Sequence, residues 1–267
     1  MDLLPQKQNI QKSYIICSTG RSGSTLLGRS LAQLKCCGTP EEYFHYKRLQ
    51  GLDLKDNPDK FLDYCNSVLE VGSTSNGVFG IKMHWWQMQA FLQLARQSSL
   101  FQNKQDLEIL NYFFPNLKFI YIWRKDMAAQ AVSTTIALQT DVWEKPSENT
   151  IIKSKEKELD DKNISLKFQP LKIYRWEQKF KDQNQRWRDF LTNNNLDYYE
   201  ITNKKLIVSF QEEIRNIVAY LCVDNSLLPD VIEMATKSQS TQINKQFLRD
   251  YQRLPKFLLK IAAKVTR

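Results

Sequence analysis

The sequence predicts an α/β fold of three layers, in which a mainly parallel sheet carries helices on both faces. Two observations predict it. Short β-prone apolar runs alternate with amphipathic stretches of helical period, and a glycine- and hydroxyl-rich turn separates the first apolar run from the first helical one. Strands separated by helices pair in parallel through right-handed crossovers. With 267 residues and no internal repeat, the chain is expected to form a single domain over residues 1–267.

The expected strands are short runs rich in β-branched and aromatic residues. The run at 117–123 is almost continuously apolar, which is typical of a strand buried on both faces. The expected strands cover residues 14–17, 77–83, 117–123 and 197–201.

The expected helices have apolar residues at three- and four-residue spacing, and the first begins at Ser24 or Thr25. The segment 144–169 is polar without a clear apolar period, so we expect an exposed insertion or lid there. Residues 237–267 are expected to form a basic helical tail. The other expected helices lie near residues 86–97, 105–113, 126–140, 171–193, 207–222 and 228–236.

Positive charge is concentrated in the tail. The net charge is +9, and residues 237–267 hold eight Lys or Arg against one Asp, so +7 of the total lies there. The nearly neutral remainder argues against a nucleic-acid surface. It favours a local anion site or a tail that contacts a membrane surface, with a solvated terminal helix as the alternative.

Cysteine, histidine and hydropathy exclude other classes of protein. Five cysteines without CxxC spacing, together with two histidines, predict neither a disulfide framework nor a structural metal. No apolar run approaches the roughly 18 residues of a membrane span, and the first residues lack the apolar stretch of a signal peptide. We therefore expect a cytoplasmic protein.

The turn after the first strand is the strongest candidate binding site. From Ser18 to Thr25 it reads STGRSGST. Such a loop, leading into a helix, directs backbone N–H groups and a positive helix end at one spot where an anion binds. Arg21 adds a guanidinium that can grip a phosphate with two hydrogen bonds. In the alternative the serines only cap the helix, and the loop alone leaves both interpretations open.

A nucleotide kinase or triphosphatase is the obvious rival. Its loop reads GxxxxGK[ST], with the lysine on the terminal phosphates and the hydroxyl on magnesium. Here Gly20 and Gly23 are separated by only two residues, and the cation precedes the second glycine. The strand at 117–123 is followed by Arg124, where a magnesium-binding Asp would be expected, so this position suits a second phosphate better.

Five blocks of the sequence occur in an order that matches a known family. They read RSGSTLL at 21–27, GTPEEYF at 38–44, NGVFGIKMHW at 76–85, RKD at 124–126 with QAVS at 130–133, and QTDVW at 139–143. This set resembles sulfotransferases that use 3′-phosphoadenylyl sulfate (PAPS), in particular the bacterial trehalose 2-sulfotransferase family. The resemblance covers about residues 14–143, with weaker similarity at Trp187, at 197–201 and from Gln239 to Tyr251. Five blocks in register are specific, whereas one alone would be weak support.

The resemblance implies a role for each matching residue on the donor side. The first loop would wrap the 5′-phosphosulfate, and Arg21 would stabilise the oxygen that leaves with the phosphate. Arg124 and Ser133 would bind the 3′-phosphate, with Asp126 as a helix N-cap between them. Sulfuryl transfer of this kind needs no metal. The implied donor-binding residues are Ser18, Arg21, Ser22, Gly23, Ser24, Thr25, Arg124 and Ser133.

The resemblance also implies a catalytic carboxylate. An acceptor hydroxyl loses its proton as it attacks, so a general base is required within hydrogen-bond reach. Glu42 occupies the family's position for this base, and we predict that it acts with Arg21 in catalysis. Glu41 and His45 are the neighbouring alternatives. Thr39 stands where the family usually has a Glu, a departure that affects the acceptor contacts more than the transfer chemistry.

Lys82 is a candidate for binding the sulfuryl oxygens, with a snorkelling surface lysine as the alternative. Aromatic rings beside polar groups suit a carbohydrate, although tryptophans are more often core residues. The predicted substrate-binding residues are Lys82, His84, Trp85 and Trp143.

The sequence therefore predicts a PAPS-dependent sulfotransferase that acts on a hydroxyl of a small-molecule sugar, a glycolipid or a related metabolite. An atypical P-loop nucleotide kinase and a non-enzymatic protein that binds nucleotides or a membrane surface are the alternatives. We expect some of Lys237, Lys245 and Arg249 to lie near the 3′-phosphate. The sequence does not decide between a monomer and a homodimer. The last helix places Phe257, Leu258, Ile261 and Val265 in one row, suited to docking on the domain or to weak contact with an anionic membrane.

Overall fold

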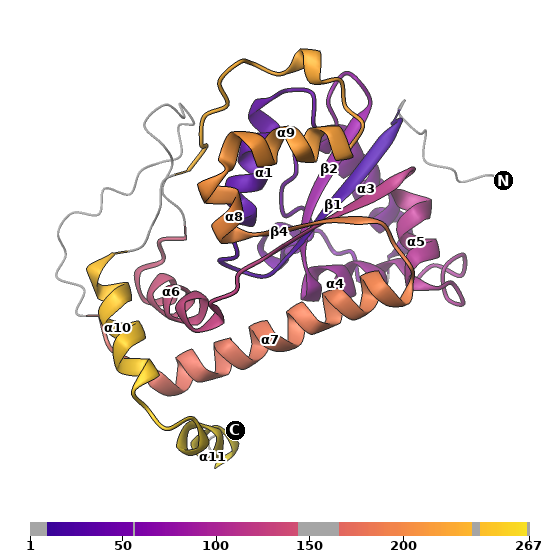
Figure 1. The fold of residues 1–267 in the computed structure, drawn as a ribbon. Helices are drawn as coiled ribbons and strands as arrows, with labels where there is room; N and C mark the ends of the chain where they lie inside the picture. Colours follow the sequence, from indigo (N-terminus) through magenta and orange to yellow (C-terminus); the bar gives the residue numbers. More distant parts are fainter. Residues whose placement is uncertain (1–9, 56, 144–165, 237–240, 266–267) are drawn as a thin grey trace. The chain divides into compact units, whose positions relative to one another are not determined.

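The structure, a computed structural model, describes residues 10–55, 57–143, 166–236 and 241–265. They group into two compact units. The first comprises Met1–Trp123 and Gln183–Glu233, and the second comprises Arg124–Asp182 and Met234–Arg267. The long helix α7, Pro170–Asn193, contributes to both units (Figure 1).

The first unit is built on a parallel sheet. Within the described residues the sheet has four strands in the order β2-β1-β3-β4, and every neighbouring pair is parallel. The register pairs Ser18 with His84 and Ile16 with Lys82, so β1 and β2 end at the same edge. All four predicted strands are confirmed: β1 Lys12–Ser18, β2 Val78–His84, β3 Leu117–Trp123 and β4 Tyr198–Thr202.

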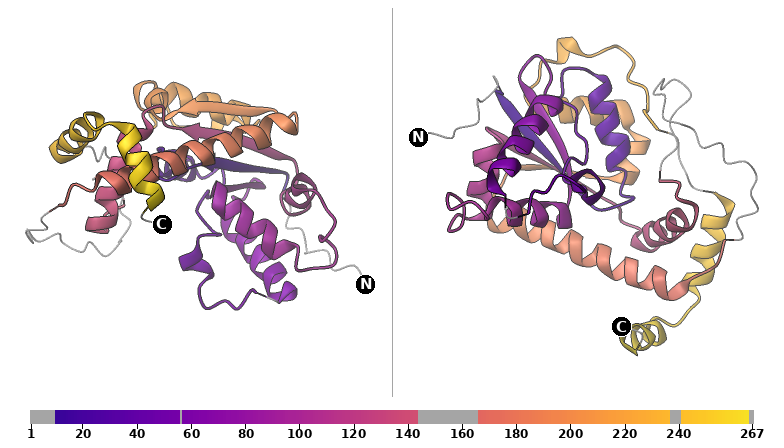
Figure 2. Two further views of the ribbon diagram at one scale, coloured as in Figure 1. Left: turned by 90° about the horizontal axis from the view of Figure 1, so that it is seen from below. Right: turned by 180° about the vertical axis from the view of Figure 1, so that it is seen from behind.

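Both faces of this sheet are covered by helices, which confirms the predicted fold class. Alternating strand residues divide the core, so that Ile15 and Phe119 belong to one cluster and Ile16 and Ile120 to the other. The first cluster includes residues of α3, α4 and α5, and the second includes residues of α1 and α9. The left view of Figure 2 shows α3 and α9 on opposite sides of the strands.

The helices of the first unit follow the predicted segments with three differences. The predicted helix 207–222 is two helices, because the chain breaks at Ser209 between α8 and α9. Helices α2 and α3 were not predicted. The bounds are α1 Ser24–Gln33, α2 Tyr46–Leu49, α3 Pro58–Gly72, α4 Trp85–Ala95, α5 Asp106–Phe113, α8 Asn203–Val208, α9 Phe210–Tyr220 and the 3₁₀ turn Asn225–Leu227.

The third difference is the predicted helix at 228–236, which is wrong. This stretch has no helix. Pro229 disfavours the helical conformation of the residue before it. Arg215 on α9 donates to the carbonyl oxygens of Pro229 and Asp230, at 2.8 and 2.9 Å, and so holds this segment in an irregular path.

The second unit has its own helical core. It consists of α6 Met127–Thr140, residues 170–182 of α7, α10 Gln242–Gln252 and α11 Lys256–Val265. Val132, Ile173, Phe247 and Tyr251 are buried together there. Of the predicted tail 237–267, the structure describes residues 241–265, which contain helices α10 and α11. Of the predicted insertion at 144–169, residues 144–165 lie outside the described residues.

Helix α11 presents its apolar row outward. Phe257, Leu258, Ile261 and Val265 are between 52 and 79% exposed, whereas Leu259, outside that row, is buried in the core of the second unit. The helix is therefore attached through Leu259. None of the helices in the described ranges is long and apolar enough to cross a membrane.

Candidate active site

The glycine-rich loop, residues 19–23, joins the end of β1 to the start of α1. The N-cap of α1 is Gly23, whose φ of +95° lies in the left-handed region. A Cβ there would lie 2.3 Å from Nδ2 of Asn203, so a side chain would also crowd α8. No side chain caps the start of α1 among the described residues. The N-cap is therefore a glycine and not one of the serines, as the alternative required. The positive end of α1 faces the loop.

Two loop residues are held in unusual states. Arg21 has a φ of +62°, a conformation that costs a non-glycine residue on the order of 1 kcal/mol. Ser22 is fully buried, yet its hydroxyl has no hydrogen-bond partner within the described residues. Such an unsatisfied group costs about 1–3 kcal/mol. A bound anion that accepts from this hydroxyl would remove that cost.

Lys82 places a buried cation beside this loop. The residue is 6% exposed, so the alternative of a snorkelling surface lysine is wrong. Its Nζ donates to Oγ1 of Thr25, in the first turn of α1, at 3.1 Å. The same ammonium lies 3.0 Å from Oε1 of Glu42. The register of β2 therefore brings the start of α1 and the predicted base to one cation.

Glu42 reaches this position because the chain after α1 returns along β2. The N–H of Lys82 donates to the carbonyl of Glu41 at 3.0 Å. Pro40, the residue before Glu41, approaches α1 closely at Gly28. A Cβ at position 28 would lie 2.9 Å from the carbonyl oxygen of Pro40, so glycine allows this approach. Glu42 is thereby fixed against both α1 and β2.

The second oxygen of Glu42 is held by Gln87, a residue that the sequence analysis did not identify. Gln87 is fully buried on α4, and its Nε2 donates to Oε2 of Glu42 at 2.8 Å. Its own Oε1 accepts from the backbone N–H of His84 at 2.7 Å, which fixes the amide. A glutamine three residues after a helix N-cap was the available sequence signal.

Opposing effects set the protonation of Glu42. Burial would raise the pKa of this carboxyl, but the charges of His84 and Lys82 and the hydrogen bonds from Lys82 and Gln87 lower it to about 2. Burial lowers the pKa of His84 despite the opposing charge of Glu42, so the imidazole is neutral at neutral pH. The ammonium of Lys82 is the cation in direct contact with this carboxylate.

His84 connects the ends of β1 and β2. Its Nδ1 lies 3.0 Å from Oγ of Ser18, and its Nε2 lies 3.6 Å from Oε2 of Glu42. The carbonyl of Ser18 accepts from Nε1 of the buried Trp187 at 3.0 Å. Trp85 in turn packs edge-on against Trp187 at 5.1 Å, which places it against the core.

The alternative bases have other contacts. Glu41 lies on the surface, and its Oε2 is 3.5 Å from Arg48. Nδ1 of His45 accepts from the N–H of Lys47 at 3.3 Å at the start of α2, and its ring lies against Trp86. Glu42 alone of the three carries an ion pair to Lys82 among the contacts of the described residues.

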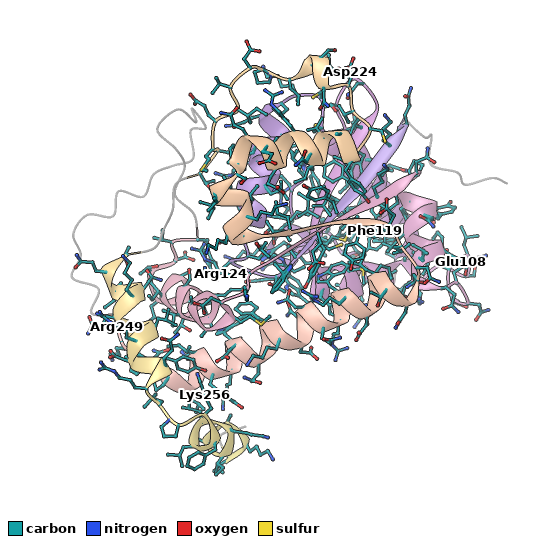
Figure 3. The ribbon with its side chains drawn as sticks, viewed as in Figure 1. Glu108, Phe119, Arg124, Asp224, Arg249 and Lys256 are labelled. Carbon is teal, nitrogen blue, oxygen red and sulfur yellow. The ribbon has the colours of Figure 1, made fainter. Side chains whose placement is uncertain are left out.

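The remaining predicted residues belong to the second unit. Arg124 is partly buried, and burial lowers its pKa against the charge of Asp126. Asp126 caps α6 by accepting from the N–H of Ala129 at 2.8 Å, as predicted. Ser133 lies in the second turn of α6, and Nε1 of Trp143 donates to Asp141 at 3.3 Å. Figure 3 labels Arg124 near α6.

The basic side chains expected near the 3′-phosphate are only partly described. Lys245 and Arg249 are exposed on α10, where Figure 3 labels Arg249, and Lys237 lies outside the described residues. Within the described ranges, no three His, Cys, Asp or Glu side chains are grouped as metal ligands would be.

Comparison with known proteins finds one family and relatives that are similar to this chain. The family described as Stf0 sulphotransferase matches residues 13–254. The trehalose 2-sulfotransferase of Mycobacterium tuberculosis (strain ATCC 35801 / TMC 107 / Erdman) is 33% identical over 159 residues, which are 49% of this chain and 59% of that protein. The trehalose 2-sulfotransferase of Mycolicibacterium smegmatis (strain ATCC 700084 / mc(2)155) is 25% identical over 275 residues, which are 90% of this chain and 96% of that protein.

A solved structure, the sulfotransferase domain from the Synechococcus PCC 7002 olefin synthase, aligns with 94% of this chain and 91% of its own. The TM-score is 0.39 and the identity is 16%.

Proposed function

The chain belongs to the Stf0 sulphotransferase family, and from this premise we propose that it transfers a sulfuryl group from PAPS to a hydroxyl of a carbohydrate, glycolipid or related metabolite. One observation carries the proposal: Lys82 joins the predicted base Glu42 to Thr25 at the start of α1. A cation, a carboxylate and a helix N-terminus at one place are what transfer of an anionic group to a hydroxyl requires. The names of the two relatives support a sugar as the acceptor.

The loop fits the phosphosulfate end of PAPS. Within the described residues the hydroxyl of Ser22 has no hydrogen-bond partner, and the N-cap of α1 is a glycine with no side chain to cap the helix. The 5′-phosphosulfate would supply an acceptor at both places. The positive φ of Arg21 is a strained conformation of the kind that concentrates at binding sites. The residues that would hold this end of the donor are Ser18, Arg21, Ser22, Gly23, Ser24 and Thr25.

We assign the 3′-phosphate to the second unit. Arg124 supplies a guanidinium whose charge is partly shielded from water, which strengthens its attraction for an anion. Asp126 fixes the start of α6 and thereby the turn that carries Ser133.

In the reaction the acceptor oxygen attacks sulfur in line, and the bond from sulfur to the bridging oxygen breaks. Glu42 takes the proton of the acceptor hydroxyl, while Arg21 and Lys82 stabilise the charge on the oxygen that leaves and on the sulfuryl oxygens. His84, Trp85 and Trp143 remain our candidates for acceptor contacts. Since His84 is largely buried and Trp85 packs on the core, Trp143, which is 41% exposed, is the best placed of them to stack on a sugar.

Two measurements test this function. Transfer of labelled sulfuryl from PAPS to trehalose, other sugars and glycolipids should give a sulfated product without added metal. In calorimetry the product nucleotide 3′-phosphoadenosine 5′-phosphate (PAP) should bind more tightly without magnesium than ATP binds with it. Tight binding of ATP and magnesium with phosphoryl transfer would instead establish a kinase. Binding of PAP with no transfer to any acceptor would favour the non-enzymatic alternative.

A further inference from the structure

The two oxygens of Glu42 have partners of different kinds. Oε2 is held at 2.8 Å by the Gln87 amide, which is fully buried and is itself fixed by the backbone of His84. Oε1 faces the ammonium of Lys82 at 3.0 Å. One oxygen is therefore anchored by a neutral group on a rigid helix, and the other by the end of a long side chain.

Lys82 is shared between Glu42 and the start of α1. Its Nζ contacts Oγ1 of Thr25 at 3.1 Å, and its side chain is only 7% exposed. An anion bound at the start of α1 would compete with Glu42 for this ammonium, because both lie within reach of the same flexible stem. An oxygen that is occupied by an ammonium is a poor acceptor for a further proton.

Resting on the proposed function, we propose that Lys82 blocks the base until the donor is bound. The sulfuryl group of PAPS draws the ammonium away from Oε1 of Glu42, while Gln87 keeps Oε2 in place. Oε1 is then free to accept the proton of the acceptor hydroxyl. The bond between the acceptor oxygen and sulfur forms, the bond from sulfur to the bridging oxygen breaks, and its electron pair stays on the 5′-phosphate of the nucleotide.

The charges around Glu42 favour this exchange. Lys82 and His84 face it from β2, and His45 from the chain segment that follows it. Burial lowers the pKa of both histidines, and the ammonium of Lys82 is the group in direct contact with Oε1 of Glu42. Once Lys82 has turned to the sulfuryl group, burial acts on the carboxyl with less opposition, and its pKa rises from about 2. The free enzyme then has a weak base and the donor complex a stronger one.

Proton uptake on donor binding is the direct consequence. At about pH 5, Glu42 of the free enzyme is ionised, and a carboxyl whose pKa rises towards this value takes up a fraction of a proton. Calorimetric titrations with PAPS and with PAP, each in two buffers of different ionisation enthalpy, measure this uptake without catalysis. Because the phosphate monoesters of both nucleotides exchange protons of their own near this pH, the contribution of Glu42 is the difference in uptake between the wild-type protein and Glu42→Gln. This difference should be positive with PAPS and near zero with PAP, which lacks the sulfuryl group.

Glu42→Gln is the informative variant, with Glu41→Gln as its matched neighbour. In Glu42→Gln, proton uptake with PAPS should fall below that of the wild-type protein, and the affinity for PAPS relative to PAP should rise on the order of 5- to 10-fold, because Lys82 no longer leaves an ion pair. Glu41 pairs with Arg48 on the surface, so Glu41→Gln should behave as wild type in both measurements.

The outcomes separate this inference from the proposed function. Equal proton uptake in wild type and Glu42→Gln, or an unchanged ratio of affinities, would overturn the blocking role of Lys82 while leaving the sulfotransferase intact. An equal difference in proton uptake between wild type and Glu42→Gln with PAP would overturn the assignment of Lys82 to the sulfuryl group. Failure of the wild-type protein to bind PAPS at all would overturn the proposed function itself.

Discussion

Each unit contains a carboxylate that is shielded from water and paired with lysine, yet the paired lysines differ in what they do. In the first unit, Glu42 pairs with Lys82, which is buried and also contacts the start of α1. In the second unit, Glu177 of α7 accepts from Lys181 at 2.8 Å and from Tyr251 at 2.6 Å, and lies 3.4 Å from Lys256.

The exposure of the lysines distinguishes the two clusters. The side chains of Lys181 and Lys256 are 51 and 45% exposed, so their ammonium groups contact water in addition to Glu177. Glu177 therefore joins α7 to α10 and α11. Its lysine partners lie at the surface and do not border the loop at residues 19–23 in the contacts given for them among the described residues. Lys82 has little access to water and can exchange Glu42 only for another anion. A buried ion pair indicates a site when its cation also borders a place where a ligand fits.

The largest expected contrast is in turnover. Glu42→Gln should lower turnover roughly 10²-fold or more, the usual scale for loss of a general base, and leave PAP affinity within a few-fold. Glu177→Gln should leave turnover within about 3-fold, because the hydrogen bonds and ion pairs given for Glu177 among the described residues are with the second unit. Initial rates with a cognate acceptor measure both. If Glu42→Gln were fully active, Glu41 or His45 would be the base.

As pH falls, both clusters should contribute less to the free energy of unfolding. Burial would raise the pKa of Glu177, but hydrogen bonds from Lys181 and Tyr251 lower it, and the pKa of Glu42 is lowered to about 2. A carboxyl whose pKa is depressed on folding stabilises the protein above its unfolded pKa and loses that contribution as pH falls through the folded value. Urea unfolding at intervals from about pH 5 to pH 2 should show the loss, on the order of 3 kcal/mol for Glu42. Glu42→Gln should lack that part of the loss.

Arg124→Ala tests whether the second unit binds the donor in addition to its structural role. It should weaken binding of PAP by on the order of 1.5–3 kcal/mol, through loss of a charge-assisted contact. Binding of adenosine 5′-phosphosulfate, which lacks the 3′-phosphate, should change much less. Calorimetry that finds equal losses for both nucleotides would place Arg124 away from the 3′-phosphate.

Tyr251→Phe isolates the structural cluster. The change removes the hydroxyl that donates to Glu177 and keeps the buried ring. We expect the free energy of unfolding to fall by about 1–2 kcal/mol, with no change in PAP affinity. Thermal unfolding and calorimetry on the same preparation measure the two effects. A large loss of PAP affinity would show that this cluster also supports the donor site.

Truncation after Arg253 should have the smallest effect on catalysis. It removes α11, which joins the core of the second unit through Leu259 and exposes its apolar row. PAP binding should stay within about 3-fold, while any binding to anionic vesicles at low salt should disappear. A full-length protein that ignores such vesicles would exclude the membrane interpretation. Loss of PAP binding on truncation would show that α11 is part of the donor site's support.

Much of the first unit could be predicted because its signals are local. The four strands are contiguous apolar runs, and the loop is a compact motif. The ion pair of Glu42 and Lys82 could not be predicted, because it depends on the residues around Glu41 lying alongside β2. Helix α3 was missed although Phe61, Cys65 and Val68 have helical spacing and Asn57 and Pro58 form a recognisable start. The helix at 228–236 was predicted from spacing alone, against the signal of Pro229.

The contact between Trp187 and Ser18 connects an intrinsic fluorophore to the residue before the glycine-rich loop. The indole of Trp187 is tied to the last residue of β1, directly before the loop, and lies edge-on to the indole of Trp85 at 5.1 Å. Two indoles at this separation couple electronically, so the pair should produce a paired feature in circular dichroism. A small change at the end of β1 alters the angle or polarity that this pair experiences. Ligand entry at the loop is therefore observable by tryptophan emission and dichroism, with no attached dye.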